Sequence, residues 1–84
     1  MSGPGADVAA LVRMVNQIAA NVAHHPHDQA VTEIAAHLRL FWPLSMRAGL
    51  VGYLDGGGVG LTPLALEATE RLRPPAVTPA ASAR

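Results

Sequence analysis

The sequence predicts an all-α protein, built as a small bundle of three to four short helices. Apolar residues recur at helical spacing in two long stretches, prolines and glycines separate the stretches, and no segment alternates apolar and polar residues as a strand would. The 84 residues suffice for one small domain. We expect this helical domain at 7–73, between a disordered leader at 1–6 and a disordered Pro/Ala-rich tail at 74–84.

The first two helices have the clearest patterns. We expect the first at 8–23, where Asp7 can cap the free amides of the first turn. Pro26 cannot continue a helix, so the histidine-rich turn around it ends this pattern, and Asp28 is expected to cap the second helix. Pro43 ends the second helix. The predicted inward faces consist of Val8, Leu11, Val12, Val15, Ile18, Ala19 and Val22, and then of Val31, Ile34, Ala35, Leu38, Phe41 and Trp42.

Two weaker helices should complete the bundle. Ser45 is expected to cap a third helix that extends to Tyr53, and the glycine-rich stretch 56–60 should follow it as a flexible break. Thr62 and Pro63 mark the start of a fourth helix, because a hydroxyl cap followed by proline is a typical first turn. This helix should extend to 73, where two further prolines stop it.

The composition excludes several functional classes. Six arginines balance six carboxylates, so the chain lacks the basic surplus of a nucleic-acid-binding protein. The absence of cysteine excludes disulfides and thiolate metal sites, and it fits a reducing compartment. No apolar run reaches the roughly 18 residues of a membrane-spanning helix. These features predict a soluble, intracellular protein that binds neither nucleic acid nor membranes.

The residue patterns favour structural roles over catalysis or cofactor binding. The histidines of the 24–27 turn lack the spacing of a helical two-histidine metal site, which favours a solvated loop. The stretch 55–60 has no preceding strand and the chain has no lysine, so a hinge is preferred over a phosphate-binding loop, with weak anion binding left open. Glu33 and His37 lie four residues apart, which favours an ordinary surface pair over an acid–base couple. We therefore predict that the chain holds no cofactor or metal and has no catalytic residues.

The end of the second helix is predicted to bind a partner. Leu40 lies opposite the apolar face, and the adjacent Phe41 and Trp42 point about 100° apart, so the two rings cannot fill one pocket together. A helix end that is apolar nearly all round is usually buried on several sides. The alternative, one ordinary exposed leucine with both aromatic rings folded inward, stays open. The candidate anchors are Arg39, Trp42 and Arg47.

Three segments, in order, resemble the delta subunit of NAD-dependent formate dehydrogenases. They are LVRMVNQIAANV (11–22), IAAHLRLFWPLSMR (34–47) and DGGGVGLTP (55–63). The second resembles the family's histidine-x-arginine-x-phenylalanine-tryptophan run, which a methionine-arginine pair follows closely. The matching positions are His37, Arg39, Phe41, Trp42, Met46 and Arg47. The chain departs from the pattern at Pro43, which follows the tryptophan directly, and at Ser45, which takes the position of an arginine.

The resemblance implies a function by association. Enzymes of this family are soluble cytoplasmic complexes that oxidise formate and reduce NAD. Their large subunit carries a molybdenum or tungsten pterin cofactor, and diaphorase-type subunits carry FMN, iron–sulfur centres and the NAD site. The delta subunit is implied to bind no cofactor, to be non-catalytic, and to stabilise or help assemble the large catalytic subunit, through which it joins the diaphorase-type subunits.

We expect docking through the segment 38–46, flanked by His37 and Arg47. The predicted contact residues are His37, Arg39, Leu40, Phe41, Trp42, Met46 and Arg47. One alternative is a free helical chaperone that escorts the large subunit or its pterin cofactor and then leaves. Further alternatives are a self-associating bundle and, last, a catalytic role for the chain itself.

Overall fold

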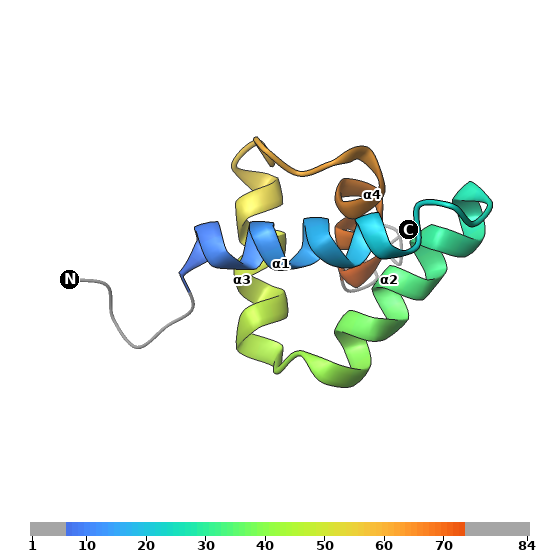
Figure 1. Ribbon diagram of the computed structural model, residues 1–84. Coiled ribbons are helices and arrows are strands. Elements are labelled where there is room, and N and C mark those ends of the chain that lie inside the picture. Colours follow the sequence, from blue (N-terminus) through green and yellow to red (C-terminus); the bar gives the residue numbers. More distant parts are fainter. Residues whose placement is uncertain (1–6, 74–84) are drawn as a thin grey trace, which may run out of the picture.

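The computed structural model describes residues 7–73, and in this part of the chain the backbone forms four α-helices and no strand (Figure 1). The helices are α1 (Val8–Asn21), α2 (His27–Phe41), α3 (Leu44–Asp55) and α4 (Pro63–Leu72). The predicted all-α class is confirmed. The leader expected at 1–6 and the tail expected at 74–84 lie outside the described residues. None of the four helices is long and apolar enough to cross a membrane.

The N-caps of α2 and α3 are prolines, Pro26 and Pro43. Each lies two residues before the predicted cap, which was Asp28 for α2 and Ser45 for α3. The carbonyl of Pro26 accepts a hydrogen bond from Ala30 N at 2.8 Å, and that of Pro43 accepts one from Arg47 N at 3.2 Å. Each proline has the fixed φ and extended ψ of a residue that precedes a helix. Asp28 and Ser45 therefore lie inside the first turn, and neither is the cap. The first helix, α1, ends at Asn21 rather than at the predicted residue 23.

The caps of α1 and α4 match the prediction. Asp7 accepts a hydrogen bond from Ala9 N at 3.1 Å, so its carboxylate satisfies an amide of the first turn of α1. Thr62 accepts from Ala65 N at 3.4 Å and is followed by Pro63 at the first helical position of α4.

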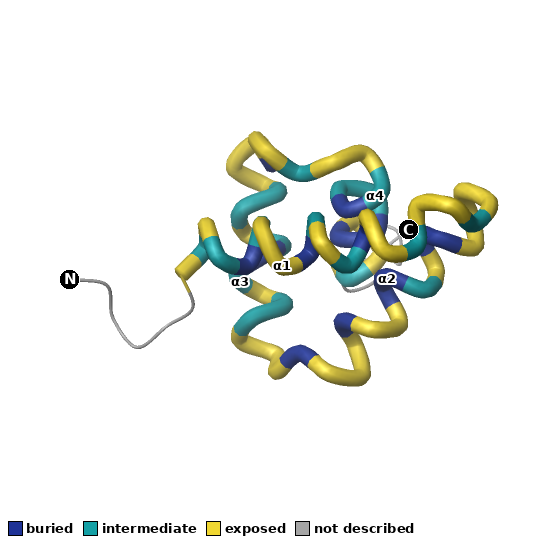
Figure 2. Tube along the Cα trace, in the orientation of Figure 1, coloured by how far each residue is buried: buried dark blue, intermediate teal, exposed yellow. Residues whose placement is uncertain are grey.

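The four helices enclose one core. In Figure 1, α1 lies across α3 and α4, and α2 extends away from its far end. Every helix contains buried residues, which are dark blue in Figure 2. Of the described residues, those that form the core are Leu11, Val15, Ala19, Val31, Ile34, Ala35, Leu38, Trp42, Leu50, Ala65 and Ala68. The inward faces of α1 and α2 are thus confirmed at their central positions, whereas α3 contributes only Leu50 as a fully buried side chain.

The glycine-rich loop between α3 and α4, predicted to be a flexible break, forms hydrogen bonds with α1 and α3. The side chain of Asn16 on α1 donates to the carbonyl of Gly60 at 2.8 Å and accepts from Thr62 N at 3.0 Å. The hydroxyl of Tyr53 donates to the carbonyl of Val59. Three glycines of the loop have positive φ, a conformation that L side chains rarely adopt. The loop that was expected to act as a hinge is therefore bonded to the bundle by the side chains of Asn16 and Tyr53.

We expect Asn16→Ala to destabilise the chain by about 1–3 kcal/mol, because two hydrogen bonds that hold the loop are lost at once. Urea denaturation followed by circular dichroism measures this change. Gln17→Ala is the matched control, since this exposed neighbour only reaches Asn21 within its own helix, and it should change stability by less than about 0.5 kcal/mol. We call the two hydrogen bonds of the Asn16 side chain to the loop the Asn16 clamp. Equal losses of stability in the two variants would show that this clamp contributes nothing.

Candidate interaction surface

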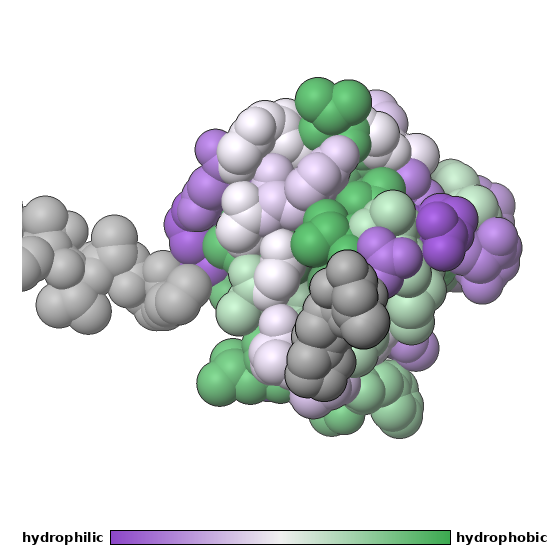
Figure 3. Space-filling model, turned by 90° about the vertical axis from the view of Figure 1, so that its left-hand side faces the viewer, coloured by the Kyte–Doolittle hydropathy of each residue, from purple (hydrophilic) through white to green (hydrophobic). Residues whose placement is uncertain are grey.

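Exposed apolar side chains gather where α2 meets α3. Leu40 is 76% exposed, Phe41 69% and Leu44 71%. Hydrophobic residues stand out along the lower end of the space-filling view, the end at which α2 and α3 join in Figure 1 (Figure 3). The ring of His37 lies 4.8 Å from that of Phe41 and extends the surface along α2. We call His37, Leu40, Phe41 and Leu44 the corner patch.

Pro43 determines which aromatic ring joins the core. The residue before a proline avoids helical geometry, and Trp42 is extended, with φ −98° and ψ 133°. The amide of Trp42 closes the last turn of α2 on the carbonyl of Leu38 at 3.0 Å. Phe41 is still helical and stays outside, whereas the chain bends at Trp42 and carries the indole inward.

Trp42, which the predicted contact set includes, lies in the core. Its side chain is 6% exposed and belongs to the core cluster of this chain. A buried indole stabilises the fold of the chain itself and offers no outward anchor. The apolar pattern predicted both aromatic residues on the inward face, and this is confirmed for Trp42 but wrong for Phe41, the last residue of α2, which stays exposed.

The remaining predicted contact residues differ in their surroundings. Arg39 is exposed, and its Nη2 donates to the carbonyl of Arg71, which joins the end of α2 to the end of α4. Met46 is half-buried and packs against the core. Arg47 is also half-buried, and its Nε is shielded from solvent without an acceptor among residues 7–73. The corner patch thus contains only part of the predicted set.

Leu44 is the member of the corner patch that sequence reasoning did not name as a contact. It lies inside the segment 38–46 that was expected to dock. The sequence does contain a signal for its exposure, since Leu44 is a large apolar residue directly after Pro43. It therefore lies on the first turn of α3, where no earlier turn of that helix can cover it.

A groove of about 300 Å³ runs beside α3 and reaches the end of α4. Its lining residues are Leu44, Arg47, Ala48, Val51, Gly52, Asp55 and Leu72. Asp55 is already paired, since its Oδ1 accepts from Arg73 Nη1 at 2.6 Å. This hydrogen bond raises the pKa of Arg73, and the nearby Glu70 carboxylate adds to the effect. Arg47 is therefore the lining charge whose Nε lacks an acceptor among the described residues.

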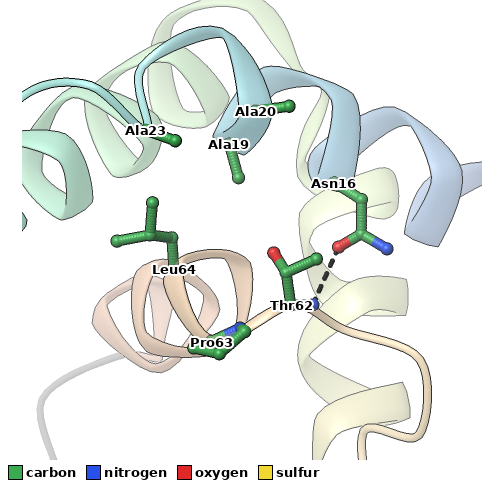
Figure 4. Close-up of a pocket in the computed structure, with 7 residues that line it drawn as sticks. All are labelled: Asn16, Ala19, Ala20, Ala23, Thr62, Pro63 and Leu64. Atoms are coloured by element: carbon green, nitrogen blue, oxygen red, sulfur yellow. Dashed lines mark hydrogen bonds between the residues drawn. The ribbon is translucent and has the colours of Figure 1, made fainter.

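A second groove, of about 240 Å³, lies between α1 and the start of α4 (Figure 4). Ala19 and Ala20 of α1, with Ala23 just beyond its end, line one side, Pro63 and Leu64 line the other, and Asn16 lies at one end, bonded to Thr62. The lining residues are Asn16, Ala19, Ala20, Ala23, Thr62, Pro63 and Leu64. The lining is mostly apolar and carries no titratable side chain, and its polar side chains, Asn16 and Thr62, already form hydrogen bonds within the chain.

The histidine-rich turn forms surface contacts. His27 Nε2 lies 2.7 Å from Glu67 Oε1, and His25 lies 3.7 Å from Glu33, so these side chains join α2 to α4 and to the turn. The ligand atoms of His27, Asp28 and Glu67 lie within 4.8 Å of one another and are the described residues that could share a cation. They lie at the N-terminus of α2, where the positive end of the helix dipole disfavours a cation.

Comparison with known proteins identifies the family. The model of the NADH-dependent formate dehydrogenase delta subunit FdsD matches residues 10–69. That range contains the Asn16 clamp, the corner patch and the glycine loop. No curated protein and no solved structure matches the chain. The chain belongs to the FdsD family of formate dehydrogenase delta subunits.

Proposed function

We propose that the chain is a non-catalytic accessory subunit that stabilises or helps to assemble the large catalytic subunit of a cytoplasmic NAD-dependent formate dehydrogenase, and that it docks through the corner patch. Family membership supports the enzyme complex. The observation that carries the docking is the exposure of three neighbouring apolar side chains, Leu40, Phe41 and Leu44, at one end of the bundle.

Covering the corner patch would contribute substantial free energy. Burying a leucine or phenylalanine side chain is worth about 1.5–3 kcal/mol relative to leaving it in water. Three such side chains lie within five positions of one turn, and His37 supports the ring of Phe41 from the preceding turn. Aromatic anchors surrounded by smaller contacts are typical of interface hot spots. The patch is thus suited to a larger protein surface.

The titratable side chains support an accessory role. His27 is bonded to Glu67, and Asp55 is bonded to Arg73. These pairs lie on the outside of the helices and join one helix to another. Exposed pairs of this kind are ordinary surface contacts between helices and do not by themselves indicate a catalytic site.

We expect Phe41→Ala to weaken binding to the catalytic subunit at least tenfold, because truncation of an interface anchor costs roughly 1.4 kcal/mol or more. Co-purification from the host, followed by titration of purified subunits, measures the loss. Val59→Ala is the control, since Val59 is 77% exposed and lies in the α3–α4 loop, away from the patch.

Circular dichroism should show both variants folded like the natural chain. Undiminished binding of Phe41→Ala would contradict docking through the corner patch. Gel filtration of the mature enzyme then separates the two main roles. A subunit stays at fixed stoichiometry, whereas release of the chain from the mature enzyme would favour the free chaperone. A stable oligomer of the isolated chain would favour self-association.

A further inference from the structure

We propose that the groove beside α3 receives a helix of the catalytic subunit whose facing side is apolar and carries a carboxylate opposite Arg47. This inference rests on the proposed function and extends it to a second surface. Leu44 belongs both to the corner patch and to the lining of the groove, so one partner can cover the two without a break.

The outer face of α3 has the composition of an interface rather than of a solvated surface. α3 contributes Leu50 to the core, yet apolar or small residues also follow its outer side at positions 44, 48, 51 and 52. These positions share one face at helical spacing. A surface helix normally places charged residues there, and a helix that is apolar on several sides is usually covered on several sides.

The side chains in the middle of this face are small. Ala48 and Gly52 follow Leu44 in a row at intervals of four residues, and a Cβ atom added at Gly52 would meet nothing within 4 Å. Rows at this interval form the ridges and grooves through which helices pack. Small residues in such a row let a second helix approach closely. The face runs the length of α3, roughly 18 Å at 1.5 Å per residue, which suits about three turns of a partner helix.

The charge of the groove selects the partner's chemistry. Asp55 at one end is neutralised by Arg73 at 2.6 Å. Arg47 at the other end is half-buried, and its Nε has no acceptor among residues 7–73. The chain itself shields the Nε, so a partner carboxylate would bind the terminal guanidinium nitrogens, in a directional, charge-assisted way. The complement of this groove is therefore apolar and anionic.

Filling the groove tests the proposal without removing any contact of the chain itself. Gly52→Leu adds a side chain into open space and replaces glycine by a better helix former, so the free chain should be at least as stable as before. We expect the variant to bind the catalytic subunit at least tenfold more weakly. Ala20→Leu is the matched control, because it enlarges an exposed alanine in the groove between α1 and α4.

Replacing the charge tests the carboxylate. Arg47→Met keeps an unbranched side chain of similar length and removes every donor. We expect a further loss of roughly tenfold to a hundredfold in affinity for the catalytic subunit, as for a hydrogen bond to a charged group. The affinity of the natural chain for the catalytic subunit should fall as salt is raised, whereas the affinity of Arg47→Met should not depend on salt. The difference between the two proteins should therefore shrink in high salt. Equal affinity of Arg47→Met and the natural chain would overturn the anionic complement.

A crosslink identifies the occupant. The chain has no cysteine, so Ala48→Cys carries a single thiol in the groove for a photoreactive maleimide label. In the assembled complex, we expect the label to react with an acidic, helical segment of the catalytic subunit. Reaction with residues 74–84 of the same chain, or with a second copy, would overturn the proposal.

The outcomes also separate this inference from the proposed function. In one outcome, the natural chain binds the catalytic subunit, Phe41→Ala weakens that binding and Gly52→Leu leaves it unchanged. The proposal for the groove is then wrong, and the proposed function stands. If the natural chain fails to bind the catalytic subunit at all, the proposed function is wrong and the groove falls with it.

Discussion

Replacing Trp42 with alanine should lower the free energy of unfolding of the isolated chain by about 3–5 kcal/mol. The indole is 6% exposed and packs with core residues at the point where the chain leaves α2. Its removal leaves a cavity that the surrounding helices can close only in part. Small domains are stable by about 5–15 kcal/mol, so a loss of this size unfolds a measurable part of the protein.

Urea denaturation monitored by circular dichroism gives the difference directly, with Phe41→Ala as the matched control. Phe41 is the adjacent residue and is 69% exposed, so its truncation should change stability by no more than about 0.5 kcal/mol. The two aromatic neighbours therefore have opposite expected roles, one in folding and one in binding. A small change for Trp42→Ala would contradict the position of the indole in the core.

The folding role of Trp42 also shows where sequence reasoning works and where it fails. Periodicity predicts the inward faces of α1 and α2, because side-chain direction in a regular helix depends only on position along it. Trp42 lies at the end of that regularity. Pro43 makes its backbone extended, and the direction of the indole then depends on the path of the turn rather than on a 100° rotation.

Contacts between distant residues were beyond the local patterns altogether. Asn16 bonds to the loop around Gly60 and Thr62, which lie more than forty positions further along the chain. The glycine pattern alone indicated a flexible break, and only the placement of α1 against the loop shows that it is held. The groove beside α3 has the same origin, since Leu72 at the end of α4 forms part of its wall.

The docking segment was predicted from a feature that can be read from the local sequence. An apolar residue opposite the inward face of a helix is unusual, and Leu40 is indeed 76% exposed. Which of the neighbouring apolar residues share that exposure depends on the turn that follows. Leu44 joins Leu40 at the surface because α3 begins there and turns its own inward side, through Leu50, toward the core.

Replacing Leu50 with alanine should cost about 2–5 kcal/mol of stability, the range for a leucine removed from a packed core. Leu50 is 0% exposed and is the core residue through which α3 packs against the other helices. Leu44→Ala makes the same chemical change on the same helix at a side chain that is 71% exposed, and it should cost less than about 0.5 kcal/mol. Thermal and urea denaturation of the isolated chain measure both.

Binding should show the reverse order for these two leucines. At a temperature where both variants are folded, Leu44→Ala should bind the catalytic subunit several-fold more weakly, since Leu44 borders both the corner patch and the groove beside α3. Leu50→Ala should bind almost as the natural chain does, because its lost methyl groups face inward. The two variants thus separate folding from recognition on a single helix. Weak binding by Leu50→Ala while it is still folded would mean that the interface depends on the packing of α3 rather than on its outer face.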